Sequence, residues 1–166
     1  MSLEGQGSDI MIVDGAFEID MPRERLFKVI TDPALMASCV PGCESIERID
    51  ATTYRAIVTV AISFIKARFN LVIEVTRETP PESIASITRG EEGGRASQLT
   101  ATNEVVLIDL GEGRARLQYV SDLSVTGRLG KFALGMMKKK AQVLAHEFVD
   151  NLKIKVSSSM HDGAAN

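Results

Sequence analysis

The chain opens on a segment in which apolar and polar side chains alternate. Within residues 10–20, Phe17 and Ile19 alternate with Glu18 and Asp20. A period of two places successive side chains on opposite faces of the backbone, as in a strand with one buried face. We therefore expect a β-strand over residues 10–20.

Two short helices are predicted next. Pro22 suits the first turn of a helix, where its missing N–H would have no partner in any case, and apolar residues at helical spacing follow up to Ile30. Asp32-Pro33 ends this helix, because the residue before a proline is driven out of helical geometry. A second helix is expected over residues 34–39, closed by Pro41-Gly42.

From residue 44 onward the pattern is typical of strands. The clearest run is 68–76, where Phe69, Leu71 and Ile73 share one face of the predicted strand. Short turns are expected at 80–81, 90–94 and 111–113, so consecutive strands should pair in an antiparallel meander. The strands themselves are predicted over 44–50, 54–65, 68–76, 84–88, 99–110 and 114–125.

A long helix over residues 127–156 is the last predicted element. Its apolar stripe, which should lie against the sheet, consists of Ala133, Met137, Ala141, Leu144, Phe148 and Leu152. Leu129, Phe132 and Met136 point away from this stripe, so the first half of the helix is apolar almost all round. A helix of that kind is expected to be buried or to contact a further molecule.

The order strand, two helices, six strands and long helix predicts an α+β helix-grip fold. In this fold a curved antiparallel sheet of about seven strands wraps the long C-terminal helix and leaves a cavity between them. The chain is expected to form a single domain over residues 9–156. Residues 1–8 are expected to be an expression scar or a disordered lead-in, and 157–166 a disordered tail.

Composition narrows the function classes. The 166 residues are 45% hydrophobic with a net charge of −3, so the basic footprint of a nucleic-acid-binding protein is missing. Cys39 and Cys43 are too few for a disulfide scaffold and suit a reducing cytoplasm. There is no apolar run of the roughly 20 residues needed to span a bilayer, and no secretory signal.

Residues suited to metal or nucleophilic chemistry are scarce. His146 and His161 are the two histidines, and neither has the partners of a metal site or a catalytic triad. Asp32, Asp109 and Asp122 could act as carboxylate acids or bases, but such aspartates are more often turn formers or caps. We therefore expect no metal, no cofactor and no enzymatic activity.

The two cysteines and the glycines have simpler interpretations. Metal binding by Cys39 and Cys43 would need two further ligands, so we expect both to pack as small apolar side chains. Gly90, Gly93 and Gly94 lack the lysine and the following helix of a phosphate-binding loop, and predict a hairpin turn.

A basic run interrupts the long helix. Lys138, Lys139 and Lys140 follow Arg128 and Lys131 along the chain. One interpretation is a solvated collar. The alternative is a docking surface for an anionic membrane or an acidic partner, because Phe132, Met136 and Val143 share the helical sector of Lys139.

The block Cys39-Val40-Pro41-Gly42-Cys43-Glu44, with Asp32-Pro33 before it, resembles the family of the carbon monoxide dehydrogenase G subunit. This family lies in the START-like (SRPBCC) helix-grip superfamily of hydrophobic-ligand binders, and the likeness runs from about Met11 to Lys155. It implies a non-catalytic accessory protein that assists or recruits a molybdenum hydroxylase. Implied roles are recruitment to the inner face of the membrane, maturation, and handling of a quinone.

Two segments depart from the family pattern. Residues 61–64 replace a glycine-proline pair in the middle of the sheet, and 128–132 replace part of a glycine-rich helix start, so the ligand should differ in shape. Many members also continue into a membrane-associating extension, which weakens the expectation of direct anchoring here.

The hypothesis is a protein that binds a quinone- or lipid-like molecule in an apolar cavity. The expected ligand-binding residues are Met36, Cys39, Val58, Val60, Ile62, Phe69, Leu71, Ile73, Asn103, Leu117, Tyr119, Ser121, Leu129, Phe132 and Met136. One alternative is an enzyme of the cyclase, aromatase or hydratase kind on the same fold, with Tyr119 or Asp122 as acid or base. Another is a structural module with a filled core.

Overall fold

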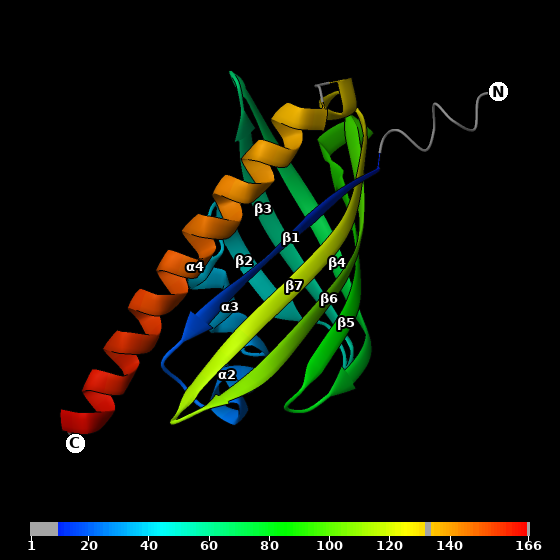
Figure 1. Cartoon of the computed structure of the whole chain (residues 1–166). Coiled ribbons are helices and arrows are strands. Elements are labelled where there is room, and N and C mark those ends of the chain that lie inside the picture. Colours follow the sequence, from blue (N-terminus) through cyan, green and yellow to red (C-terminus); the bar gives the residue numbers. More distant parts are fainter. Residues whose placement is uncertain (1–9, 132–133, 166) are drawn as a thin grey trace.

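A curved sheet and one long helix dominate the computed structural model, which describes residues 10–131 and 134–165 (Figure 1). The strands are β1 (Ile10–Ile19), β2 (Cys43–Arg48), β3 (Thr53–Ile62), β4 (Ile65–Thr79), β5 (Ser83–Glu92), β6 (Ser97–Gly111) and β7 (Arg114–Gly127). The helices are α2 (Arg23–Ile30), α3 (Pro33–Cys39) and α4 (Leu134–Ala165), with 3-10 turns η1 (Gly93–Arg95) and η2 (Leu129–Lys131).

The sheet is antiparallel throughout, in the order β1-β7-β6-β5-β4-β3-β2. Consecutive strands pair with each other from β2 to β7, and β1 pairs with β7. Helix α4 runs diagonally across the concave side, and α2 and α3 lie at one end (Figure 1). This arrangement confirms the predicted helix-grip fold with seven strands.

Several predicted strand boundaries differ from the structure, and two of the differences involve turns. The segment 54–65 is not one strand, because Ser63 adopts a positive φ of 56° and turns the chain between β3 and β4. The loop expected at 90–94 begins later, since β5 continues through Gly90 to Glu92. Gly90 lies inside the strand, and a Cβ there would lie 2.3 Å from a side-chain carbon of Leu71 on the neighbouring strand.

The segment 127–156 is also not one continuous helix. Gly127 ends β7 with a φ of 83°, and a Cβ there would lie 2.3 Å from the carbonyl oxygen of Ala96. The 3-10 turn η2 follows, and α4 begins at Leu134. It runs to Ala165, so the helix includes most of the segment 157–166 for which the composition predicts a tail.

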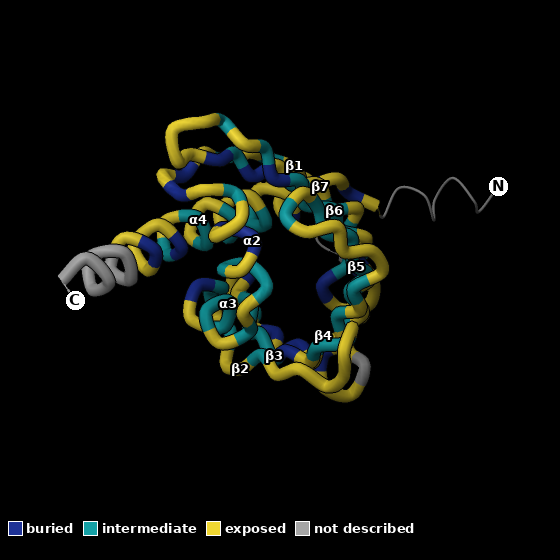
Figure 2. Tube along the Cα trace, turned by 90° about the horizontal axis from the view of Figure 1, so that it is seen from below, coloured by how far each residue is buried: buried dark blue, intermediate teal, exposed yellow. Residues whose placement is uncertain are grey.

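Two packed clusters fill different parts of the interior. One joins α2, α3 and the far half of α4 to the sheet through Met21, Leu26, Leu107 and Leu152. The other joins η2 and the start of α4 to β1, β3 and β4 through Met11, Phe69, Leu129 and Met137. Figure 2, viewed from the end that carries α2 and α3, shows the strands curving around the interior with the three helices on the open side.

Candidate functional site

An apolar cavity of about 390 Å³ lies between the sheet and the helices. This volume is within the range of small-molecule sites in proteins, roughly 300–1,000 Å³. The apolar part of its wall consists of Phe17, Ile30, Pro33, Met36, Ile46, Tyr54, Ile73, Val75, Ile84, Val105, Leu117, Tyr119, Ala145, Phe148 and Val149. The polar part consists of Thr31, Asp32, Glu78, Ser86 and Asn103.

The alternation of side chains along the strands and the register between strands determine which residues form the inner wall of the cavity. Val105 of β6 lies between Ile84 of β5 and Tyr119 of β7, and all three side chains face inward. One step along the same strands, Asn103 lies between Ser86 and Ser121. A row of apolar side chains therefore lies beside a row of polar ones.

The polar row is a closed hydrogen-bond network centred on Asn103. Its Nδ2 donates to the hydroxyls of Ser86, at 3.3 Å, and Thr88, at 3.1 Å. Its Oδ1 accepts from the Ser121 hydroxyl at 2.7 Å. Asn103 is half-buried, and because an amide shielded from water costs free energy unless it is hydrogen-bonded, these three partners stabilise the carboxamide and hold it in one orientation.

Tyr119 is one of two tyrosines that line the cavity, and its phenol lies beside a glycine. It pairs across the sheet with Gly15, and a Cβ at Gly15 would lie 2.6 Å from the phenol oxygen. The missing side chain lets the tyrosine ring lie along β1. Burial raises the pKa of Tyr119 above its ordinary value, and the negative charge of Asp14 adds to this shift. The group is therefore a neutral hydroxyl near pH 7.

The two carboxylates on the wall lie where elements end. Asp32 caps α3, accepting hydrogen bonds from the backbone N–H groups of Ala34 at 3.0 Å and Leu35 at 3.2 Å. Glu78 is exposed near the end of β4. Among the described residues, no lysine, arginine or histidine lines the cavity.

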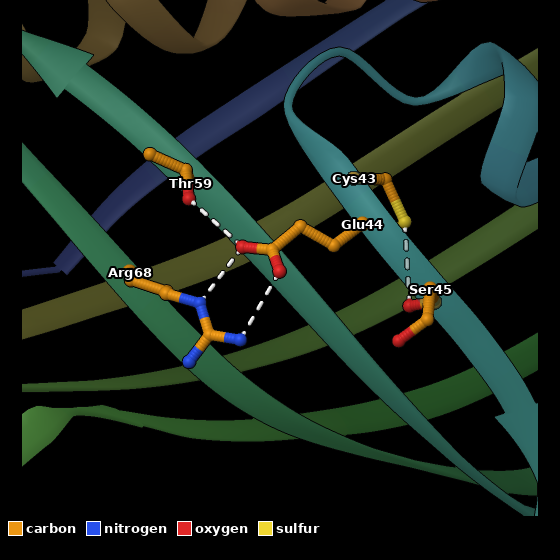
Figure 3. A network of polar contacts seen from close by, with 5 residues as sticks. All are labelled: Cys43, Glu44, Ser45, Thr59 and Arg68. Carbon is orange, nitrogen blue, oxygen red and sulfur yellow. Dashed lines mark hydrogen bonds and ion pairs between the residues drawn. The ribbon is translucent and has the colours of Figure 1, made fainter.

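The Pro-Gly-Cys-Glu block fastens α3 to the sheet (Figure 3). Gly42 has a φ of 76°, and its carbonyl accepts from the Thr59 N–H at 2.9 Å. The carboxylate of Glu44 accepts from Arg68 Nε at 2.8 Å and Nη2 at 3.1 Å. The Cys43 thiol donates to the Ser45 carbonyl at 3.4 Å, and burial raises its pKa above the ordinary range. A thiol with a raised pKa is a poor nucleophile.

The model of the family described as the G subunit of carbon monoxide dehydrogenase (CoxG) matches residues 15–157 of the chain. The chain belongs to the CoxG family. No curated protein matches it significantly.

Solved structures share the fold of this CoxG-family chain. A conserved protein from Geobacillus kaustophilus is 23% identical, with a TM-score of 0.83 over 90% of this chain and 97% of that one. A START superfamily protein from Mycobacterium smegmatis is 15% identical, with a TM-score of 0.72 over 89% and 97%. The Zhui aromatase/cyclase from Streptomyces sp. R1128 is 13% identical, with a TM-score of 0.67 over 89% and 94%.

The structure brings together some of the expected ligand residues of this CoxG-family chain. Met36, Ile73, Asn103, Leu117 and Tyr119 line the cavity, and Ser121 lies behind Asn103 as its hydrogen-bond partner.

Other expected ligand residues lie away from the cavity. Those in the packed clusters or against them are Cys39, Val60, Ile62, Phe69, Leu71 and Leu129. Val58 is half-buried, Met136 is 48% exposed, and Phe132 lies outside the described residues. Near the β3–β4 turn, Ile62 and Phe69 pack in one cluster with Leu129 of η2 and Met137 of α4, so that end of the interior is filled.

Sequence reasoning missed fifteen of the twenty residues that line the cavity. Ile30 and Pro33 come from the junction of the short helices, Phe148 and Val149 from α4, and Ser86 from β5. Ile84, Ser86 and Thr88 alternate along β5, and this signal could have placed Ser86 on an inner face. The residues from the helices depend on tertiary packing, which periodicity does not specify.

The expected docking residues fall into two groups. Arg128 is paired with the buried carboxylate of Glu92 and also donates to the Lys66 carbonyl at 3.4 Å. Lys138 and Lys139 are exposed, and Lys140 is half-buried. The side chain of Lys131 lies outside the described residues.

The described residues form neither a cluster of metal ligands nor a membrane-spanning helix. Over 10–131 and 134–165, no three histidine, cysteine or acidic side chains cluster as a metal site would require. Over the same residues, no helix combines the length and apolarity needed to cross a membrane.

Proposed function

We propose that this CoxG-family protein is a non-catalytic accessory protein that holds a quinone- or lipid-like molecule in its cavity and assists or recruits a molybdenum hydroxylase. The observation that carries this proposal is the apolar cavity of about 390 Å³ between sheet and helices. Pockets for small apolar ligands have such walls, with few polar groups to fix orientation. A structural module with a filled core would not leave this space.

The chemistry of the wall favours binding over catalysis. Asp32 is engaged as a helix cap, and the cysteines lie outside the cavity. Of the titratable groups on the wall, the phenols of Tyr54 and Tyr119 lie among the apolar side chains, while Glu78 lies exposed near a strand end. General acid–base catalysis normally needs groups that converge on one reacting atom.

The proposed partner follows from the family's name, which refers to carbon monoxide dehydrogenase. We place the docking surface at the start of α4, where Lys138 and Lys139 are exposed beside Met136 at 48% and Val143 at 43% exposure. Cations around exposed apolar side chains suit an acidic partner or the anionic inner face of a membrane. The proposed location is therefore cytoplasmic, at that membrane face.

Filling the cavity tests the ligand-binding role. Ala145 of α4 lines the cavity, so Ala145→Phe should occupy part of its volume and weaken binding of decylubiquinone or a hydrophobic fluorophore at least tenfold. Val143→Phe adds a similar ring on the exposed face of the same helix and should leave affinity unchanged. Titrations would be run on both variants after circular dichroism has shown them folded. Equal affinity of a folded Ala145→Phe variant would place the ligand elsewhere.

A second candidate function is an enzyme of the aromatase or cyclase kind. The fold likeness to the Zhui aromatase/cyclase and the phenol of Tyr119 on the cavity wall favour it. Asp122, the other expected acid or base, is exposed and does not line the cavity. Turnover of a substrate that the protein cyclises or aromatises, lost in Tyr119→Phe with ligand affinity retained, would support the enzyme over the carrier.

A further inference from the structure

Helix α4 carries a regularly spaced row of side chains on the face opposite its buried stripe. The row consists of Met136, Lys140, Val143, Glu147, Asp150 and Ile154. Steps of four and three residues return to the same side of a helix with 3.6 residues per turn. One long side of α4 forms the outline of the molecule in Figure 1, so a second protein can approach the helix along its length.

The apolar members of this α4 row are open to solvent. Met136 is 48% exposed, Val143 43% and Ile154 68%. Single exposed apolar side chains are common on protein surfaces, but apolar side chains aligned along one face of a helix are typical of a contact surface.

The charged members of the α4 row have no partner within their own chain. Glu147 and Asp150 are exposed, Lys140 is half-buried, and none of the three makes an ion pair with another described residue. Glu147 and Asp150 are three residues apart, a spacing at which like charges repel on a helix. Lys140 and Asp150 are roughly 15 Å apart along the axis, too far for a direct contact.

The chemistry of the α4 row is complementary about its middle, at the level of Ala145. Three pairs lie equally far from this residue: Met136 with Ile154, Lys140 with Asp150, and Val143 with Glu147. The outer pair is apolar, and the middle pair has opposite charges. A two-fold axis at this level would therefore bring each side chain against its counterpart in a second copy, as an isologous interface requires.

The charges also determine how two copies are oriented. With the helices antiparallel, Lys140 of each copy faces Asp150 of the other, so two ion pairs form in each dimer. Parallel helices in register would set Lys140 against Lys140 and Asp150 against Asp150. Like charges that face each other across an interface are strongly unfavourable, so the row favours the antiparallel arrangement.

We propose that two copies of this chain form a two-fold dimer through the α4 row, with the two helices antiparallel. The contact runs from Met136 to Ile154, about 27 Å along the helix. An interface of one helix pair is small, so we expect a dissociation constant on the order of 10 µM. This inference goes beyond the proposed function. Because Met136 and Val143 also belong to the proposed docking surface, a second copy and the acidic partner would compete for them.

A charge exchange between two positions of α4 tests the dimer. Lys140→Glu and Asp150→Lys should each weaken dimerisation about tenfold or more, because each replaces two attractions per dimer with two repulsions. The double variant Lys140→Glu/Asp150→Lys restores opposite charges across the two-fold axis, so its dissociation constant should return to within about threefold of wild type. Sedimentation velocity over a range of protein concentrations measures the dissociation constants of wild type and all three variants.

Lys138→Glu is the matched control for the charge exchange. It makes the same change of charge at an exposed position two residues from Lys140, which is about 200° away around the helix. It should leave the dissociation constant within about twofold, whereas Ile154→Asp should raise it about tenfold or more by placing a carboxylate in the apolar end of the contact.

Two results would overturn the dimer. One is a wild-type protein that stays monomeric up to about 50 times the expected dissociation constant, a concentration at which the dimer should predominate. The other is a double variant that associates no better than Lys140→Glu or Asp150→Lys. Neither result bears on the proposed ligand, because no member of the α4 row lines the cavity and the decylubiquinone titration is read separately.

Discussion

At the scale of single residues, two glycines of this chain allow close contacts that other residues would prevent. A Cβ at Gly15 would meet the ring of Tyr119, which is the flexible end of a side chain. A Cβ at Gly42 would lie 2.1 Å from the backbone oxygen of Thr59, which cannot yield in the same way. Gly42 also has a positive φ, so it combines two separate demands for glycine.

We therefore expect Gly42→Ala to destabilise the protein by about 2 to 4 kcal/mol, from backbone strain and the clash with β3. Gly94 has a positive φ of 70° but open space around it, so Gly94→Ala should cost about 1 kcal/mol. Gly93 has neither constraint, so Gly93→Ala should leave the free energy of unfolding at the wild-type value. Urea unfolding of the three variants measures these differences. An equal effect of Gly42→Ala and Gly94→Ala would show that the close approach to Thr59 has no energetic weight.

At the scale of elements, one ion pair attaches the start of the C-terminal segment to the sheet. Glu92, at the end of β5, has a side chain only 9% exposed, and it pairs with Arg128 between β7 and η2. The backbone supports the same junction, because Leu129 N–H donates to the fully buried Ser97 hydroxyl at 3.0 Å.

Arg128→Met should cost about 2 kcal/mol, because it leaves the Glu92 carboxylate buried without its cation. This is below the range for a fully buried pair, since the Arg128 side chain is 44% exposed. The double variant Arg128→Met/Glu92→Met should recover most of the loss. Thermal unfolding of both single variants and the double variant completes the cycle. A double variant no more stable than Arg128→Met would contradict this account.

How far the elements follow from sequence depends on what fixes them. The alternation over 68–76 and the Asp32-Pro33 step depend on local backbone preference. The first lies within β4, and the second lies at the junction of α2 and α3. The turn at Ser63 cannot be predicted from the sequence, because serine seldom adopts a positive φ. The extent of the cavity is even harder to predict from the sequence. Phe69 and Ile73 share one face of β4, yet only Ile73 meets empty space, since η2 packs over the other end.

At the scale of the whole molecule, charge is divided between the two ends of the sheet. The β3–β4, β5–β6 and β7–α4 connections lie at one end, because the strands are antiparallel and sequential. Residues 61–68, 89–98 and 124–143 around them carry nine of the 19 lysines and arginines but two of the 22 acidic residues. The remaining chain is strongly acidic, so the basic end has a field opposite to the net charge of −3.

The same end presents an exposed aromatic residue. Phe64, in the β3–β4 turn, is 92% exposed. The cavity lies toward the other end, since Thr31, Tyr54 and Glu78 belong to the α2–α3 junction and to the parts of β3 and β4 remote from that turn. Docking through the basic end would therefore leave the α2–α3 end free to exchange ligand with a partner.

Reversing Lys138, Lys139 and Lys140 to glutamate should then weaken co-sedimentation with phosphatidylserine-containing vesicles at low salt about 100-fold or more, at about 1 kcal/mol per lysine near the surface. The matched control changes Lys28, Lys153 and Lys155 to glutamate, which alters net charge equally at positions outside the basic end. This control should retain binding to the vesicles. In an otherwise wild-type protein, Phe64→Ser should also weaken binding to the vesicles. The affinity for decylubiquinone should be the same in all of these variants, because none of the changed residues lines the cavity. Equal losses in the two triple variants would mean that net charge, and not the basic end, governs the contact.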